Sequence, residues 1–120
     1  MSGLLSRLFP SRPKVGPAQA SDMQAQGAIL LDVREDAEWR AGHAPKARHI
    51  PLGRLPGRLR DVPANRTVIT VCRSGHRSAQ AAAMLARDGR DVVNLAGGMY
   101  AWARAGLPVV ATGGTPGHVA

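Results

Sequence analysis

The 120-residue sequence predicts an α/β protein in which helices cover both faces of an open, mostly parallel β-sheet. Segments 28–34 and 67–71 are runs of apolar and β-branched residues, a composition typical of strands that are buried on both faces of a parallel sheet. Segments with apolar residues at helical spacing, ended by glycine, alternate with these runs. Because strands and helices alternate along the chain, we expect parallel pairing of the strands.

The first half of the chain predicts five elements. Pro17 suits the first turn of a helix that Gly27 ends, and the acidic residues Glu35 and Glu38 suit the dipole at the start of the next helix. Pro51 cannot donate to a central ladder, so the strand beside it belongs at an edge of the sheet. We therefore expect a strand at 14–15, a helix at 17–26, a strand at 28–34, a helix at 35–41 and, after a turn, a short edge strand within 42–52.

The second half predicts the remaining elements and the limits of the domain. Gly89 ends one helix, and Gly106 with Pro108 ends the last one. The expected elements are a helical piece at 52–60, a strand at 67–71, a helix at 79–88, a strand at 91–95 and a helix at 99–105. We expect one domain over 14–111, a flexible segment at 1–13, and a disordered tail at 112–120 that is rich in Gly, Thr and Pro.

Composition limits the classes of function. The formal charge is +8, but the arginines are scattered and the chain has one Phe, one Tyr and two Trp, so no basic, aromatic surface for nucleic acid is expected. No apolar run reaches the roughly 18 residues that cross a bilayer. A single cysteine excludes an internal disulfide and indicates a reducing compartment, which we take to be the cytoplasm. No Cys/His spacing predicts zinc, and we expect no cofactor and a monomer or weak dimer.

That cysteine, Cys72, directly follows the second buried strand and precedes a helix. Gly75 allows the sharp turn between them, and the free N–H groups of the first helical turn point back toward the turn. Arg73, Arg77 and His76 add positive charge. Together these groups predict a lowered thiol pKa and a nucleophilic thiolate. The alternative is a buried, inert cysteine that only packs in the core.

Several motifs in order resemble a known family over about residues 14–110. They are Leu31-Asp32-Val33-Arg34, Trp39 with Gly42-His43, the segment 47–52, Cys72-Arg73-Ser74-Gly75-His76-Arg77-Ser78, Gly97-Gly98-Met99 with Trp102, and Gly106-Leu107-Pro108-Val109. These motifs resemble those of single-domain rhodaneses. The resemblance implies a five-stranded parallel sheet and a thiosulfate sulfurtransferase that works through a cysteine persulfide. The chain departs from the pattern at Lys46, which stands where many relatives have glycine, and at Arg48 and His49, which make this turn and edge strand more basic than the family pattern.

The resemblance also implies a mechanism and its residues. The Cys72 thiolate would attack the outer sulfur of a small anionic donor such as thiosulfate, and cyanide or a thiol, including a protein thiol, would then accept that sulfur. The loop would bind the substrate through Arg73, Ser74, Gly75, His76, Arg77 and Ser78. This interpretation requires that the sulfhydryl is reachable from solvent and that the loop amides point toward it.

Two further residues of the resemblance lie at the tip of the first buried strand. Asp32 either orients the cysteine loop or pairs with an arginine. Arg34 either helps to bind substrate or is a solvated or paired arginine. For Asp32 we favour the structural role, in which it pairs with an arginine.

Two other functions compete with an enzyme that turns over thiosulfate. The same loop suits a persulfide carrier that receives sulfur from one protein and hands it to another. A cysteine phosphatase would have five residues between cysteine and arginine, whereas four separate Cys72 from Arg77. A loop shorter by one residue favours a single sulfur atom over a phosphate.

Overall fold

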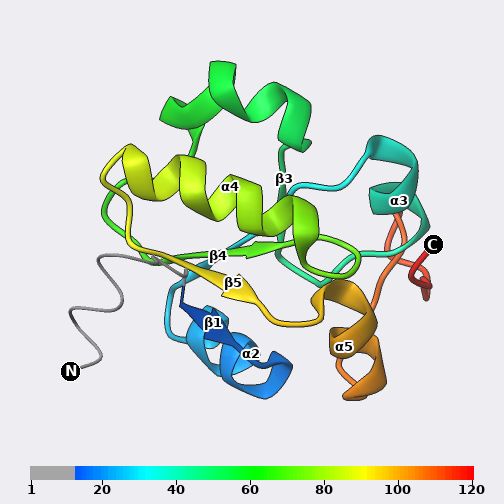
Figure 1. Cartoon of the computed structure of the whole chain (residues 1–120). Coiled ribbons are helices and arrows are strands. Elements are labelled where there is room, and N and C mark those ends of the chain that lie inside the picture. Colours follow the sequence, from blue (N-terminus) through cyan, green and yellow to red (C-terminus); the bar gives the residue numbers. More distant parts are fainter. Residues whose placement is uncertain (1–12) are drawn as a thin grey trace.

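The computed structural model describes residues 13–120, which form one five-stranded sheet in the order β1-β5-β4-β2-β3 (Figure 1). All four neighbouring pairs are parallel. The strands are β1 (Lys14–Val15), β2 (Ile29–Asp32), β3 (Arg48–His49), β4 (Val68–Val71) and β5 (Val92–Leu95). The predicted α/β class and five-stranded parallel sheet are confirmed. The flexible segment expected at 1–13 lies outside the described residues, apart from Pro13.

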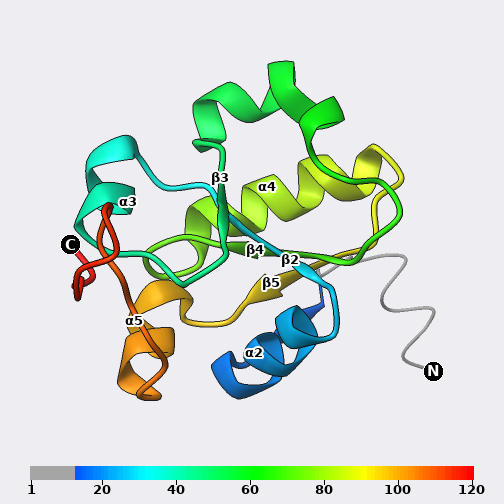
Figure 2. The ribbon, with the colours of Figure 1, turned by 180° about the vertical axis from the view of Figure 1, so that it is seen from behind.

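Helices cover both faces of this sheet, as Figures 1 and 2 show. The 3₁₀ helix η1 (Leu52–Asp61) and α4 (His76–Arg87) lie on one face, and α2 (Pro17–Ala25) and α5 (Gly98–Arg104) lie on the other. The short helix α3 (Asp36–Ala41) follows β2. Each strand and helix predicted from the sequence therefore has a counterpart among the described residues.

The hydrophobic core has two parts, one on each face of the sheet. In β2, Leu31 packs in the cluster beneath α4 and η1, whereas Leu30 packs in the cluster beneath α2 and α5. In β4, Val68 and Ile69 alternate in the same way. Because successive side chains of a strand point to opposite faces, burial on both faces favours apolar residues at most positions. This is why the two central strands are mostly apolar in the sequence, with Asp32 and Thr70 as buried polar exceptions.

Helix α4 begins at His76, three residues before the predicted start at Ala79. Gly75 precedes the helix with φ 120, a conformation that residues with a Cβ rarely adopt. The first turn consists of polar residues, so the apolar spacing that predicts the helix begins only after it. As a result, Arg77 and Ser78 belong to the first turn of α4, and the connection from β4 is very short.

The tail at 112–120 differs from the expected disorder, because it folds back onto α3. The amide of Thr112 donates to the carbonyl of Arg40 at 3.1 Å, and the amide of His118 donates to the carbonyl of Ala41 at 3.1 Å. The last carbonyls of a helix have no partner within the helix and require donors from elsewhere. Composition does not reveal such a role, since the donors are backbone groups.

Lys46 has φ 64, in the left-handed region that favours glycine. The turn before β3 therefore keeps the conformation that glycine would adopt, although a lysine occupies the position. Lys46 is exposed, so its side chain extends from the turn without displacing the core.

Candidate active site

Cys72 lies at the carboxyl end of β4, between β4 and α4. The two neighbours of β4 are β2 and β5, so the strand that carries Cys72 is central in the sheet. In open parallel sheets, sites form at the carboxyl ends of the strands. The backbone of this connection turns at Gly75, directly before the N-terminus of α4.

The sulfur of Cys72 accepts two hydrogen bonds from the loop and the first turn of α4. The Gly75 amide donates to Sγ at 3.1 Å, and the Ser78 hydroxyl approaches Sγ at 3.2 Å. Burial raises the pKa of Cys72, but the Ser78 hydroxyl and the amides of Ser78, Gly75 and Ser74 lower it by more. The net effect is a thiol pKa below the ordinary value, which favours the thiolate.

The Cys72 residue is only 1% exposed, which differs from the open sulfhydryl that the sequence interpretation requires. Cys72 belongs to the apolar cluster beneath α4 and η1, but its sulfur also accepts hydrogen bonds from two polar donors, which a cysteine that only packs in the core would not need. Of the neighbouring loop residues, Ser74 and His76 are exposed and Gly75 is partly exposed.

Two buried polar residues of the sheet hold the loop from beneath. The Thr70 hydroxyl donates to the Ser78 carbonyl at 2.9 Å, and the Asn94 side-chain amide donates to the Gly75 carbonyl at 3.3 Å. The Thr70 hydroxyl also lies 3.3 Å from the side-chain oxygen Oδ1 of Asn94, so the two side chains are in contact. The sequence alone predicts no role for Thr70 or Asn94. The available signal was a polar residue inside a run that is otherwise apolar.

The N-terminus of α5 holds the same loop from a third side. The amides of Met99 and Tyr100 donate to the carbonyls of Cys72 and Arg73, at 2.8 Å and 3.2 Å. A Cβ on Gly98 would lie 2.6 Å from the Arg73 carbonyl oxygen, closer than real Cβ contacts. The Gly97-Gly98-Met99 motif therefore allows the N-terminus of α5 to pack closely against the cysteine loop.

The two loop arginines have different environments. Arg73 is exposed, and its guanidinium carbon lies 4.9 Å from the centre of the Tyr100 ring. Arg77 forms two hydrogen bonds with the carboxylate of Glu38, from Nη1 to Oε1 at 2.7 Å and from Nη2 to Oε2 at 2.9 Å. In this structure Arg77 is thus bound to a carboxylate, whereas the sequence predicts that it binds substrate. For Glu38 the sequence predicts only an acid that suits a helix N-terminus.

The hydrogen bonds between Glu38 and Arg77 stabilise the charged form of each side chain. Chiefly because of the hydrogen bond from Arg77, the pKa of Glu38 is lowered to about 2 despite partial burial. The pKa of Arg77 is raised, chiefly by the hydrogen bond to Glu38. Glu38 also accepts a hydrogen bond from the Glu35 amide at 3.0 Å, in a capping box at the start of α3. Glu38 therefore connects α3 to the first turn of α4.

Asp32 and Arg34 form a second ion pair, and both side chains are fully buried. Arg34 Nη2 lies 2.8 Å from Asp32 Oδ2 and donates to the Gly42 carbonyl at 2.7 Å. Of the alternatives that the sequence left open, Arg34 is the paired arginine and not a solvated one. Asp32 also accepts a hydrogen bond from the Arg34 amide at 3.0 Å, so the pair fixes the turn at the end of β2.

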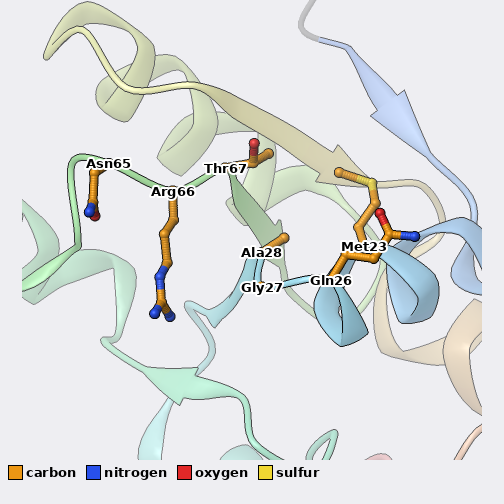
Figure 3. A pocket seen from close by; sticks show the side chains of 7 residues that line it. All are labelled: Met23, Gln26, Gly27, Ala28, Asn65, Arg66 and Thr67. Carbon is orange, nitrogen blue, oxygen red and sulfur yellow. The ribbon is translucent and has the colours of Figure 1, made fainter.

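A hollow of about 270 Å³ adjoins the outer side of the cysteine loop. It is lined by Lys14, Ser74, Gly75, His76, Ala79, Asn94, Ala96 and Gly97. A larger hollow of about 490 Å³ lies near the opposite, amino ends of β2 and β4 (Figure 3). It contains no nucleophilic thiol. Within residues 13–120, no group of three or more His, Cys, Asp or Glu side chains is arranged to hold a metal ion.

Known proteins are similar to this chain in both sequence and fold. The family model described as Rhodanese-like domain matches residues 16–105. A protein named sulfurtransferase from Allochromatium vinosum is 44% identical over 90 residues, which cover 74% of this chain and 84% of that protein. The thiosulfate sulfurtransferase GlpE of Pseudomonas syringae is 31% identical over 90 residues, 74% of this chain and 85% of its own.

Among solved structures, a rhodanese-related protein from Thermoplasma volcanium is similar to this chain with a TM-score of 0.77. The two are 28% identical, and the similar region covers 82% of this chain and 97% of the other. The likeness therefore includes nearly all of that protein's fold.

Proposed function

The chain belongs to the rhodanese-like family of sulfurtransferases, and from this premise we propose that it moves the sulfane sulfur of thiosulfate to cyanide or a thiol through a persulfide on Cys72. The observation that carries this proposal is the sulfur of Cys72, which accepts hydrogen bonds from the Gly75 amide and the Ser78 hydroxyl. These donors favour a thiolate, and a thiolate is the form that attacks sulfur.

In the first half of the reaction, the Cys72 thiolate attacks the outer sulfur of thiosulfate. A bond forms between Sγ and that sulfur, the bond between the two sulfurs of thiosulfate breaks, and sulfite leaves with the electron pair. The negative charge then rests on the outer sulfur of the persulfide. The loop amides and the Ser78 hydroxyl would stabilise this charge, as donors do for developing anions in other enzymes.

In the second half, the acceptor attacks the outer sulfur of the persulfide. With cyanide, the products are thiocyanate and the regenerated Cys72 thiolate. With a thiolate acceptor, including one on a protein, the sulfur leaves as the acceptor's persulfide. No net oxidation or reduction of the protein is needed, so a single cysteine suffices for the cycle.

The loop supports transfer of sulfur over transfer of phosphate. Four residues separate Cys72 from Arg77. A phosphate would require a wider loop. One sulfur atom extends only about 2 Å beyond Sγ and demands less space.

Because Cys72 is enclosed, we propose that residues 74–76 yield when the donor binds. The residues that bind the donor would be Arg73, Ser74, Gly75, His76, Arg77 and Ser78. Asp32 and Arg34 would act only through the backbone that they hold, since both are fully buried and paired with each other.

We place the reaction in the cytoplasm, where a lone thiol stays reduced. None of the described helices is long and apolar enough to cross a membrane. A monomer or weak dimer would suffice, because every group invoked above belongs to one chain.

Mass spectrometry of the protein after exposure to thiosulfate tests the proposal. We expect a gain of one sulfur atom, its loss on addition of cyanide with release of thiocyanate, and neither change in the Cys72→Ser variant. Absence of the added sulfur in a folded protein whose Cys72 reacts with a small alkylating agent would refute the proposal.

The carrier function makes a different prediction in the same experiment. A carrier would accept sulfur from a persulfide on another protein, but thiosulfate and cyanide would give negligible turnover. Loading from a protein persulfide without loading from thiosulfate would therefore favour the carrier over the enzyme.

A further inference from the structure

The carboxylate of Glu38 is the nearest charged partner of the arginine that follows the cysteine loop. Both oxygens of Glu38 accept hydrogen bonds from Arg77, at 2.7 Å and 2.9 Å, and the two side chains are 19% and 32% exposed. This geometry is the two-pronged pairing in which a guanidinium and a carboxylate match most closely. The positive charge of Arg77 is thus largely balanced before any substrate arrives.

Arg77 directly precedes Ser78 in the first turn of α4, and the Ser78 hydroxyl contacts Sγ at 3.2 Å. The negative charge of a Cys72 thiolate is also one of the smaller causes of the raised pKa of Arg77. A change in the charge or position of Arg77 is therefore expected to act on the sulfur. Glu38 lies on α3 and is joined to this turn by its hydrogen bonds with Arg77.

We propose that Glu38 is a positioning residue that sets the charge at the cysteine loop by binding Arg77, and thereby tunes both the thiolate and the affinity for an anionic donor. The proposal rests on the proposed sulfur transfer for its consequence on donor binding. Its consequence for the thiol does not depend on that reaction.

The two single variants should then have opposite effects. Glu38→Gln removes a negative charge and leaves Arg77 unbalanced, so the pKa of Cys72 should fall and thiosulfate should bind more tightly. Arg77→Gln removes the positive charge and leaves Glu38 unbalanced, so the pKa should rise and binding should weaken. The double variant restores the balance, so its values should return toward those of the wild type.

The pH profile of alkylation by iodoacetamide measures the thiol directly. We expect shifts of about half a pH unit in opposite directions for the two single variants, a size typical of a unit charge near a protein surface. The other charged or titratable groups around the loop and the pair, namely Arg73, His76, Lys14, Glu35 and Arg34, are unchanged in all variants. For thiosulfate, we expect KM to fall about threefold in Glu38→Gln and to rise about threefold in Arg77→Gln, with kcat changing less.

A second ion pair on the same helix provides the control. Asp36 lies 3.0 Å from Arg54 and links α3 to η1 instead of α4. Asp36→Asn and Arg54→Gln should leave the alkylation profile unchanged.

A purely structural role for Glu38 gives a distinct result. Both single variants would then lower the melting temperature and the rate of transfer together, without opposite shifts of the alkylation profile, and this outcome would overturn the proposal. If the opposite shifts appear but no sulfur is transferred, the positioning role stands and the proposed function fails.

Discussion

The two ends of the parallel sheet each carry a hollow, and they differ in what lies beneath it. At the amino ends of β2 and β4, the larger hollow of about 490 Å³ is formed by side chains that do not converge, with Arg66 extending away from Met23 (Figure 3). At the carboxyl ends, the smaller hollow of about 270 Å³ adjoins a loop that is held by hydrogen bonds from β4, β5 and α5. The larger of these two hollows is therefore not the one beside the candidate nucleophile Cys72.

The positions of the buried polar side chains are a better guide to the candidate active site. The buried polar or charged residues among those described are Asp32, Arg34, Thr70, Ser78 and Asn94. All of them contact the cysteine loop or the neighbouring turn at the end of β2. Burial of a polar group destabilises a fold unless each group finds a partner. These residues all lie at the carboxyl end of the sheet, where their hydrogen bonds fix the cysteine loop and the neighbouring turn in place.

The largest effect should come from breaking the buried pair at the carboxyl end. Arg34→Ala would leave the Asp32 carboxylate buried without its partner, and removal of one member of a buried pair costs about 3–5 kcal/mol. We expect a loss of that size in the free energy of unfolding, measured by urea denaturation. The exposed arginine of the Asp36–Arg54 pair is the control, because Arg54→Ala should cost less than about 1 kcal/mol.

Equal losses for the two arginine variants would contradict this ranking. They would mean that the pair at the end of β2 contributes no more than a surface contact. The comparison between the two ends of the sheet would then rest on the loop alone.

A smaller effect is expected from removing one donor to the sulfur. Ser78→Ala deletes the hydroxyl that lies 3.2 Å from Sγ, and with it a cause of the lowered pKa of Cys72. The pKa should rise, so the alkylation profile should move to higher pH by about one unit, since a hydrogen bond to a charged group contributes roughly 1.5–3 kcal/mol. At neutral pH the thiolate fraction, and with it the rate of alkylation, should fall.

An unchanged profile in Ser78→Ala would assign the lowered pKa to the amides alone. The matched variant Ser74→Ala separates the two cases, because it removes an exposed hydroxyl from the same loop while keeping its amide. We expect that variant to leave the profile in place.

The sequence predicted the scaffold more completely than the site, for a physical reason. The strands within segments 28–34 and 67–71 are buried on both faces, and such burial leaves a local signal, a short run of mostly apolar and β-branched residues. The position of Cys72 between strand and helix follows from the same pattern. The role of Glu38 leaves no local signal, because its partner Arg77 lies 39 residues away in the chain.

Other features of the site could not be predicted from local sequence patterns either. The enclosure of Cys72 depends on how tightly the loop closes over it, and the early start of α4 depends on the conformation of Gly75. The support from Thr70 and Asn94 arises only when β4 and β5 are adjacent. Contacts between distant segments are decided by the fold as a whole, so a single sequence does not specify them separately.

The smallest effect is expected at the amino end, and it is the sharpest check on the comparison. Arg66 is exposed and lines the larger hollow, without a part in the hydrogen bonds that hold the cysteine loop. Arg66→Ala should therefore change the free energy of unfolding by no more than about 0.5 kcal/mol and leave the rate of sulfur transfer within twofold of the wild type. Kinetics with thiosulfate and cyanide, together with urea denaturation, measure both. A fall in transfer of tenfold at unchanged stability would mean that the larger hollow takes part in the reaction, and the buried donors would no longer be sufficient to locate it.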